Sequence, residues 1–144
     1  MVKAEEDFYF KHNAAVHRGS HLLAEEANEE YENARKIIAE FIGAPSQEVI
    51  FTKSATESLN LLAYSISNTQ GFLKSGDEIL VSEMEHHANL IPWQELAKRT
   101  GSKLRWIEVG EDGRLNLSQI DSLINERTRV LAITNQSNVL GTIN

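Results

Sequence analysis

Cysteine is absent from the 144-residue sequence. The chain therefore has no disulfide framework, no cysteine metal site and no cysteine nucleophile, which fits a cytoplasmic protein. The sequence also lacks an apolar run long enough to span a bilayer. Its first residues, MVKAEEDFYFKHN, are acidic and aromatic and lack the apolar core of a signal peptide. We therefore expect no membrane partner.

Positive charge is scarce. Lys and Arg number 14 against 21 Asp and Glu, which gives a formal net charge of −7. An acidic surface repels phosphates, so neither nucleic acid nor an anionic membrane is expected as the main partner. One phosphorylated small molecule held at a local site remains compatible with this charge.

Proline and glycine are also few, with 2 and 8 residues, and they form no linker. The sequence contains no internal repeat and no low-complexity tract. Its length suffices for one domain with a hydrophobic core, so a single domain over residues 1–144 is the simplest interpretation.

Helical and strand-like patterns alternate along most of the chain. Apolar spacing predicts helices over residues 3–11, 20–42, 90–99 and 117–125, and another that begins after Ser54. Short runs of β-branched and apolar residues predict strands over 49–52, 79–81, 104–109 and 130–134. This alternation predicts an α/β fold, a mostly parallel sheet with helices on both faces.

Ligands of such sheets bind at the carboxyl ends of the strands, where residues 53–57, 83–89 and 135–141 fall. In the first of these stretches, Ser54 stands three residues before Glu57, which is a capping-box pattern. The start of a helix presents free N–H groups, so Ser54, Ala55 and Thr56 could hold a phosphate. An ordinary N-cap by Ser54 explains the same pattern.

The second stretch contains the adjacent pair His86 and His87. Neighbouring residues of an extended chain point to opposite sides, so the two imidazoles are poorly placed to share a metal ion. One imidazole could instead lie flat against a planar ligand, as stacked aromatic rings do. Spacing does not decide which histidine would do so, and an ordinary loop histidine explains the pattern equally well.

His17 and His21 stand four residues apart, which on a helix would place them on one face and could suit zinc. Arg18 and Gly19 interrupt the helical pattern, and no third ligand is evident. A structural zinc site usually takes four protein ligands, so we expect no metal site.

The third stretch contains Asn138, in Ser137-Asn138-Val139-Leu140-Gly141-Thr142. Its amide is a neutral donor and acceptor and could hydrogen-bond a phenolic oxygen of a ligand. Asparagine is equally common in simple turns.

The order and spacing of five segments resemble the cysteine desulfurases of the class V aminotransferase family, closest to the group that supplies sulfur for iron–sulfur cluster assembly. The segments are HNAAVHRGSH, YENARKIIAEFIGA, VIFTKSATESLNLLA, GDEILVSEMEHHANLIPWQ and SNVLGTIN. EHHAN…PW and SNVLGT are the specific ones. Two positions depart from the family pattern. Ala55-Thr56 stands where a Thr-Thr pair is common, and Thr134-Asn135-Gln136-Ser137 lacks a histidine that the family usually carries.

The resemblance implies a homodimeric fold type I enzyme that uses pyridoxal 5′-phosphate. Such an enzyme takes sulfur from L-cysteine, leaves L-alanine and passes the sulfur to an acceptor protein. By position, Ala55 and Thr56 would bind the cofactor phosphate. His86 would stack on the pyridine ring and help move protons as the catalytic residue. Asn138 would bond near the phenolic oxygen, and His17 would lie near the substrate entrance.

The resemblance also implies that the family's cofactor-carrying lysine, the aspartate that pairs with the pyridine nitrogen and the sulfur-receiving cysteine fall beyond Asn144. We therefore expect a partial large domain with no useful turnover from these residues alone. Selenocysteine lyase, another class V enzyme and a non-catalytic, truncated binding domain are the alternatives.

Overall fold

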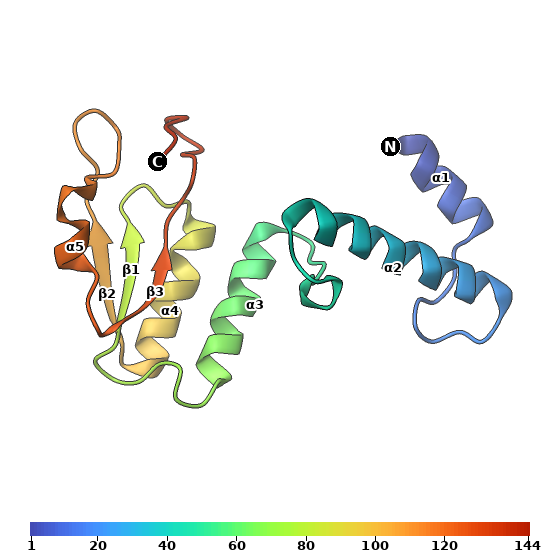
Figure 1. The fold of residues 1–144 in the computed structure, drawn as a ribbon, viewed down its shortest axis with the longest axis horizontal. Coiled ribbons are helices and arrows are strands. Elements are labelled where there is room, and N and C mark those ends of the chain that lie inside the picture. The colour runs from blue at the N-terminus through green and yellow to red at the C-terminus, as the bar shows by residue number, and fades with distance from the viewer. The chain divides into compact units, whose positions relative to one another are not determined.

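The computed structural model describes all residues from Met1 to Asn144. Figure 1 shows the order of the elements along the chain. Residues 1–51 form one compact unit and residues 52–144 form a second. The single domain expected over residues 1–144 stays a prediction. No helix in the structure combines the length and the apolar character that crossing a bilayer requires.

The first unit contains two helices, α1 (Val2–Lys11) and α2 (Leu22–Ile42), and a short 3-10 turn, η1 (Ser46–Glu48). Helix α2 begins after His21, whose Nδ1 accepts a hydrogen bond from the Ala24 amide at 3.3 Å. It ends at Gly43, which has a φ of 69°, a left-handed conformation that glycine adopts without a Cβ clash. Both helices confirm the predicted ones.

The apolar spacing that predicts α2 places Ala27, Tyr31, Ala34, Ile38 and Phe41 on one face of the helix, and this face is buried only in part. Ala27 is buried within the first unit, whereas Phe41 is 90% exposed and Ile38 is also exposed. The spacing of apolar residues therefore located the helix correctly, but it did not indicate which residues of that face are covered.

The strand predicted for residues 49–52 is wrong, because the only sheet consists of three other strands. The apolar residues of this segment serve a different contact. Phe51 packs edge-on against Tyr31, with ring centroids 5.2 Å apart, and the Arg35 guanidinium lies over both rings. Arg35 also donates a hydrogen bond to the Val49 carbonyl, so this segment is held by side chains instead of a neighbouring strand.

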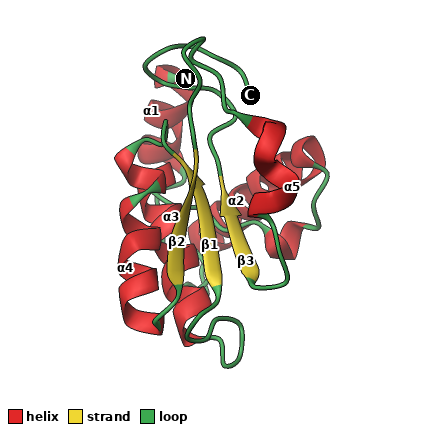
Figure 2. Cartoon of the chain, turned by 90° about the vertical axis from the view of Figure 1, so that its left-hand side faces the viewer, coloured by secondary structure: helices red, strands yellow, loops and turns green.

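The second unit is built on a three-stranded sheet of β1 (Glu78–Ser82), β2 (Lys103–Ile107) and β3 (Thr128–Ala132). The strand order is β2-β1-β3, and both pairs are parallel, as expected (Figure 2). The central strand β1 is buried along its whole length. Strands β2 and β3 begin and end one or two residues earlier than the pattern predicted. Val109, expected in β2, instead forms an isolated antiparallel bridge with Leu115.

Helices cover both faces of this sheet (Figure 2). On one face lie α3 (Ala55–Asn68) and α4 (Ile91–Thr100), and on the other lies α5 (Ile120–Leu123), which follows the 3-10 turn η3 (Leu117–Gln119). The first core contains Ala63, Ile79, Val81, Trp93, Leu96, Ala97 and Ala132, and the second contains Leu80, Ile107 and Leu115. Successive residues of β1 thus face opposite cores. This confirms the predicted α/β class.

The helix expected over 117–125 is shorter than predicted. Residues 117–119 form a 3-10 turn and only residues 120–123 are α-helical. Asn125 ends the helix, since its side-chain oxygen accepts the Arg127 amide and its own amide donates to the Thr128 hydroxyl. These local bonds compete with helix continuation, as asparagine commonly does.

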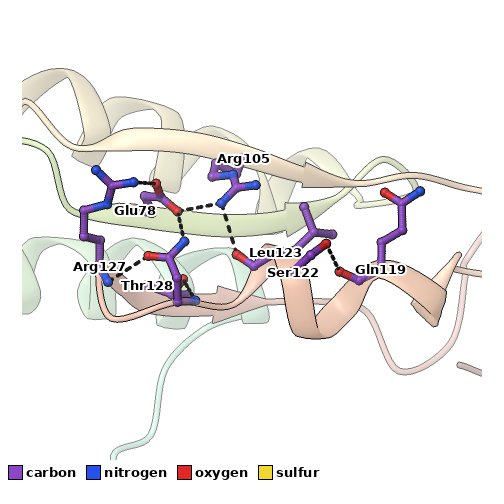
Figure 3. Close-up of polar contacts among 8 residues, drawn as sticks. Glu78, Arg105, Gln119, Ser122, Leu123, Arg127 and Thr128 are labelled. Atoms are coloured by element: carbon purple, nitrogen blue, oxygen red, sulfur yellow. Dashed lines mark hydrogen bonds and ion pairs between the residues drawn. The ribbon is translucent and has the colours of Figure 1, made fainter.

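A charged cluster joins the strands at their amino ends (Figure 3). The buried carboxylate of Glu78 accepts hydrogen bonds from Arg105 and Asn125, both at 2.9 Å, and lies 3.4 Å from the Arg127 guanidinium. These bonds hold the pKa of the Glu78 carboxyl below its usual range, the Arg105 bond first. They tie β1 to β2 and to the segment before β3.

Candidate functional site

The start of α3 leaves backbone donors free. Ser54 caps the helix, and its Oγ accepts the Glu57 amide at 3.2 Å. Glu57 reaches back and accepts the Lys53 amide at 2.5 Å, one residue earlier than in a standard capping box. The amides of Ala55 and Thr56 have no acceptor in the chain. An anion can therefore receive both N–H groups at the positive end of the helix dipole.

The histidine pair lies in the connection between β1 and α4. His86 precedes the 3-10 turn η2 (His87–Asn89), and its Nδ1 accepts the Ala88 amide at 3.1 Å. An Nδ1 that accepts a hydrogen bond has no proton, so the neutral imidazole of His86 carries its proton on Nε2. The ring centroids of His86 and His87 are 6.3 Å apart with an interplanar angle of 63°, so the two rings present different planes.

A cleft of about 480 Å³ opens beside these elements, and we call it the main cleft. Its size falls within the range of small-molecule sites. It lies at the carboxyl ends of β1 and β3, where ligands of parallel sheets bind. The residues that line it are Ala55, Leu59, Leu62, Glu85, His86, Ala88, Asn89, Trp93, Leu131, Ala132, Ile133 and Thr134. The structure thus brings Ala55 and His86 together, from α3 and from the segment after β1.

A second hollow of about 320 Å³, the side cleft, shares His86 and Ala88 with the main cleft. It is also lined by Thr56 and by His87. Three of the expected site residues, Ala55, Thr56 and His86, therefore line adjoining clefts. His87 faces only the side cleft.

Asn138 lies elsewhere, in the loop after β3. The Ser137 hydroxyl accepts the amides of Val139 and Leu140 at 3.3 and 3.1 Å, which folds the loop into a turn. Asn138 is exposed in this turn and lines neither cleft. Of the two interpretations offered for Asn138 by the sequence, this arrangement matches an asparagine in a simple turn.

His17 and His21 do not share a helical face. His17 adopts a left-handed φ of 64° in a turn, and its Nε2 lies 2.8 Å from a Glu32 carboxylate oxygen. His21 is the N-cap of α2. The structure contains no cluster of three or more His, Cys, Asp or Glu side chains arranged to hold a metal ion.

Sequence analysis did not assign a role to Glu85, which precedes His86. One oxygen of its carboxylate accepts the Ser82 hydroxyl at 2.5 Å and the Thr134 amide at 2.6 Å. The other accepts the Asn89 side-chain amide at 2.7 Å, and Asn89 in turn accepts the Trp93 indole N–H at 2.9 Å. The four-residue spacing of Glu85, Asn89 and Trp93 was the signal available in the sequence.

Charge in the main cleft is sparse. Glu85 is its one acidic residue, and neither Lys nor Arg lines either cleft. A bound anion would therefore be stabilised chiefly by the free amides and the dipole at the start of α3.

Comparison with known proteins identifies close relatives. The family model for aminotransferase class-V matches residues 1–144. A probable cysteine desulfurase of Streptomyces coelicolor is 52% identical over 147 residues, which cover 100% of this chain and 35% of that protein. The solved cysteine desulfurase of Thermococcus onnurineus NA1 superimposes with a TM-score of 0.90 at 43% identity, covering 99% of this chain and 34% of that one.

A third match is the structure of SspA in complex with cysteine, with a TM-score of 0.80 and 25% identity over 99% of this chain and 40% of that one. The chain thus spans about a third of the length of the curated relatives that it matches (35% and 34% for two of them).

Proposed function

The chain belongs to the aminotransferase class-V family, and from this premise we propose that it contributes cofactor-binding residues to a cysteine desulfurase that uses pyridoxal 5′-phosphate. Such an enzyme transfers sulfur from L-cysteine to an acceptor protein and leaves L-alanine. The names of the relatives support this reaction. One observation carries the proposal. The residues with free amides at the start of α3 and His86 line adjoining clefts at the carboxyl ends of the strands.

The residues present fit the phosphate and the ring of this cofactor. The amides of Ala55 and Thr56 are unpaired within the chain and suit a phosphate group. The loss of a hydroxyl at Ala55, where the family commonly has threonine, leaves these backbone donors intact. Bound pyridoxal phosphate would supply an electron sink that the protein side chains lack. No lysine lines the clefts, so the residues described here bind and orient the group without a covalent link.

His86 is the proposed catalytic residue and stacks on the pyridine ring. Its imidazole is exposed to both clefts, and the Ala88 amide fixes its Nδ1 as an acceptor. The Nε2 atom therefore holds the exchangeable proton, and proton movement by His86 would occur at that atom.

Asn138 is proposed to bond near the phenolic oxygen of the cofactor. Its side chain makes no hydrogen bond within the chain and is exposed, so both its donor and its acceptor are available. The proposed role requires Asn138 to face the main cleft when the cofactor is bound.

The proposed partners are L-cysteine, a sulfur-acceptor protein and a second copy of the enzyme, in the cytoplasm. The bound cysteine described for SspA supports the substrate. Exposed apolar side chains support a homodimer, among them Phe41 and Val139, which are 90% and 82% exposed.

A titration with pyridoxal 5′-phosphate tests the proposal. We expect saturable changes in cofactor absorbance, and chemical-shift changes at the Ala55 and Thr56 amides with both the cofactor and inorganic phosphate. The free amides of Leu22 and Leu23 at the start of α2 are the matched control, because they belong to another helix N-terminus. Unmoved Ala55 and Thr56 signals, or equal shifts at both helices, would contradict a specific phosphate site.

A further inference from the structure

We propose that Glu85 is a positioning residue that fixes the imidazole of His86 in the main cleft. The inference rests on the proposed function, in which His86 stacks on the cofactor ring. Glu85 itself lines the same cleft and joins three parts of the second unit: the end of β1, the turn η2 and the end of β3.

The three groups that meet Glu85 are all donors. They are the Ser82 hydroxyl, the Thr134 backbone amide and the Asn89 side-chain amide. A carboxylate accepts at both oxygens and can receive all three, whereas a glutamine side chain carries one oxygen and one NH₂ donor. The site is therefore matched to a carboxylate and not merely to a polar side chain of this length.

The orientation of Asn89 is fixed by a fourth group. The Trp93 indole N–H can only donate, and it donates to the Asn89 Oδ1. The Asn89 NH₂ must then face Glu85, and Asn89 cannot turn over without leaving Trp93 unpaired. Trp93 is buried in the core against the sheet, so the chain of hydrogen bonds runs from a rigid core residue to the cleft.

This hydrogen-bond network closes around the segment that carries His86. The bond from Asn89 to Glu85 spans the three residues between them, and the Asn89 backbone amide donates to the His86 carbonyl at 2.8 Å. Ala88, inside the same turn, supplies the amide that holds the His86 ring. Fixing both ends of the turn therefore fixes the plane of the imidazole and keeps its proton on Nε2.

The bond to the segment just after β3 uses a backbone group. Glu85 accepts the amide of Thr134, so the contact does not depend on which side chain stands there. The departure from the family pattern just after this position thus leaves the tether between the two strand ends in place.

The test compares Glu85→Gln with Glu83→Gln, which lies in the same connection between β1 and α4. Glu83 accepts one hydrogen bond, from the Val109 amide at 3.0 Å, which a glutamine oxygen can still accept. Each change removes one negative charge, and the two positions are only two residues apart in the sequence. Only Glu85→Gln sets an NH₂ group against another donor, which is the Asn89 NH₂ in one orientation of its amide and the Thr134 backbone N–H in the other. Asn89→Asp is a second variant, because it keeps the acceptor for Trp93 and converts only the donor that faces Glu85.

Two measurements are made on each variant of the protein. The first is the ¹⁵N NMR signature of the His86 ring with hydrogen exchange of the Ala88 amide, neither of which needs cofactor. The second is the dissociation constant for pyridoxal 5′-phosphate. We expect Glu85→Gln and Asn89→Asp to give a mixed His86 tautomer, with faster exchange and cofactor binding weakened about tenfold, as the loss of a part-buried hydrogen bond to a charged group can cause. We expect Glu83→Gln to match wild type within about twofold.

The outcomes separate the two proposals. An unchanged His86 ring in folded Glu85→Gln and Asn89→Asp, with wild-type cofactor binding, overturns the positioning role and leaves the proposed function standing. A perturbed ring in a protein whose wild type binds no cofactor overturns the proposed function and leaves the positioning of His86 standing. Circular dichroism reports folding. Loss of folding in both Glu85→Gln and Asn89→Asp overturns the positioning role in favour of a general structural one.

Discussion

Glu78 Oε2 accepts a hydrogen bond from Arg105 Nη1 at 2.9 Å, which joins the first residue of β1 to the middle of β2 (Figure 3). Asn125 donates to the same oxygen, and Arg127 approaches the other. The cluster lies at the amino ends of the strands, whereas the clefts lie at their carboxyl ends. One end of the sheet therefore serves stability, and the other is left for ligands.

The first prediction concerns acid stability. The bonds from Arg105 and Asn125 lower the pKa of Glu78 from its ordinary 4.5. A carboxyl with a lowered folded-state pKa stabilises the protein above its unfolded-state pKa, and this stability is lost as the pH falls through the folded value. Glu78→Gln should thus be less stable than wild type above pH 4.5, and the two should converge below it. Denaturant midpoints measured from pH 7 to pH 2 check this.

Glu111→Gln is the control for that series, because Glu111 is exposed and takes part in no hydrogen bond or ion pair. Its stability should follow the wild-type curve at every pH. A constant difference between Glu78→Gln and wild type across the whole range would show that Glu78 acts through packing and not through its charge.

The second prediction concerns the core between α4 and the sheet. Leu96 is fully buried there at 0% exposure, and Leu96→Ala should cost about 2–5 kcal/mol through lost burial and the cavity left behind. Leu61, on α3, is 44% exposed, and Leu61→Ala should cost less than about 1 kcal/mol. Denaturant unfolding of both variants measures the difference, and equal losses would place Leu96 outside the core.

Local patterns predicted the helices well where one residue decides the boundary. Gly43 ends α2 and Ser54 begins α3, and both are visible in the sequence because their side chains, or the lack of one, determine the backbone. The buried run of β1 was equally clear. The segment 49–52 has the same composition as a strand, but composition does not show whether a partner strand exists. Phe51 packs on Tyr31 instead.

The sequence placed only some residues of the candidate site, because local patterns do not show long-range contacts. Ala55, Thr56 and His86 belong to the carboxyl ends of strands or to the helix that follows, and topology brings them together. Glu85 could not be assigned from the sequence, because its three donors come from Ser82, Asn89 and a backbone amide 49 residues away. Asn138 lies outside the clefts because Ser137 folds its own loop into a turn.

The third prediction concerns the N-cap of α3. Ser54→Ala removes the acceptor of the Glu57 amide and should cost about 1 kcal/mol, whereas Ser54→Asp keeps an acceptor and should restore most of the stability. Ser65→Ala is the control, since the Ser65 hydroxyl only donates to the Leu61 carbonyl in mid-helix. A Ser54→Ala protein as stable as wild type would mean that solvent caps the helix equally well.

The last prediction separates the two histidines. His86 lines both clefts and has its Nδ1 held by the Ala88 amide, whereas His87 lines only the side cleft. A ring that stacks on the cofactor must face the main cleft, so in the full-length enzyme His86→Ala should change the absorbance of bound pyridoxal 5′-phosphate more than His87→Ala. His86→Phe keeps a stacking ring without the Nε2 proton. In the full-length enzyme it should retain most of the cofactor binding and lose the proton-dependent part of the activity. Equal spectra for the two alanine variants would assign stacking to neither histidine alone, and full activity in His86→Phe would exclude proton movement at Nε2.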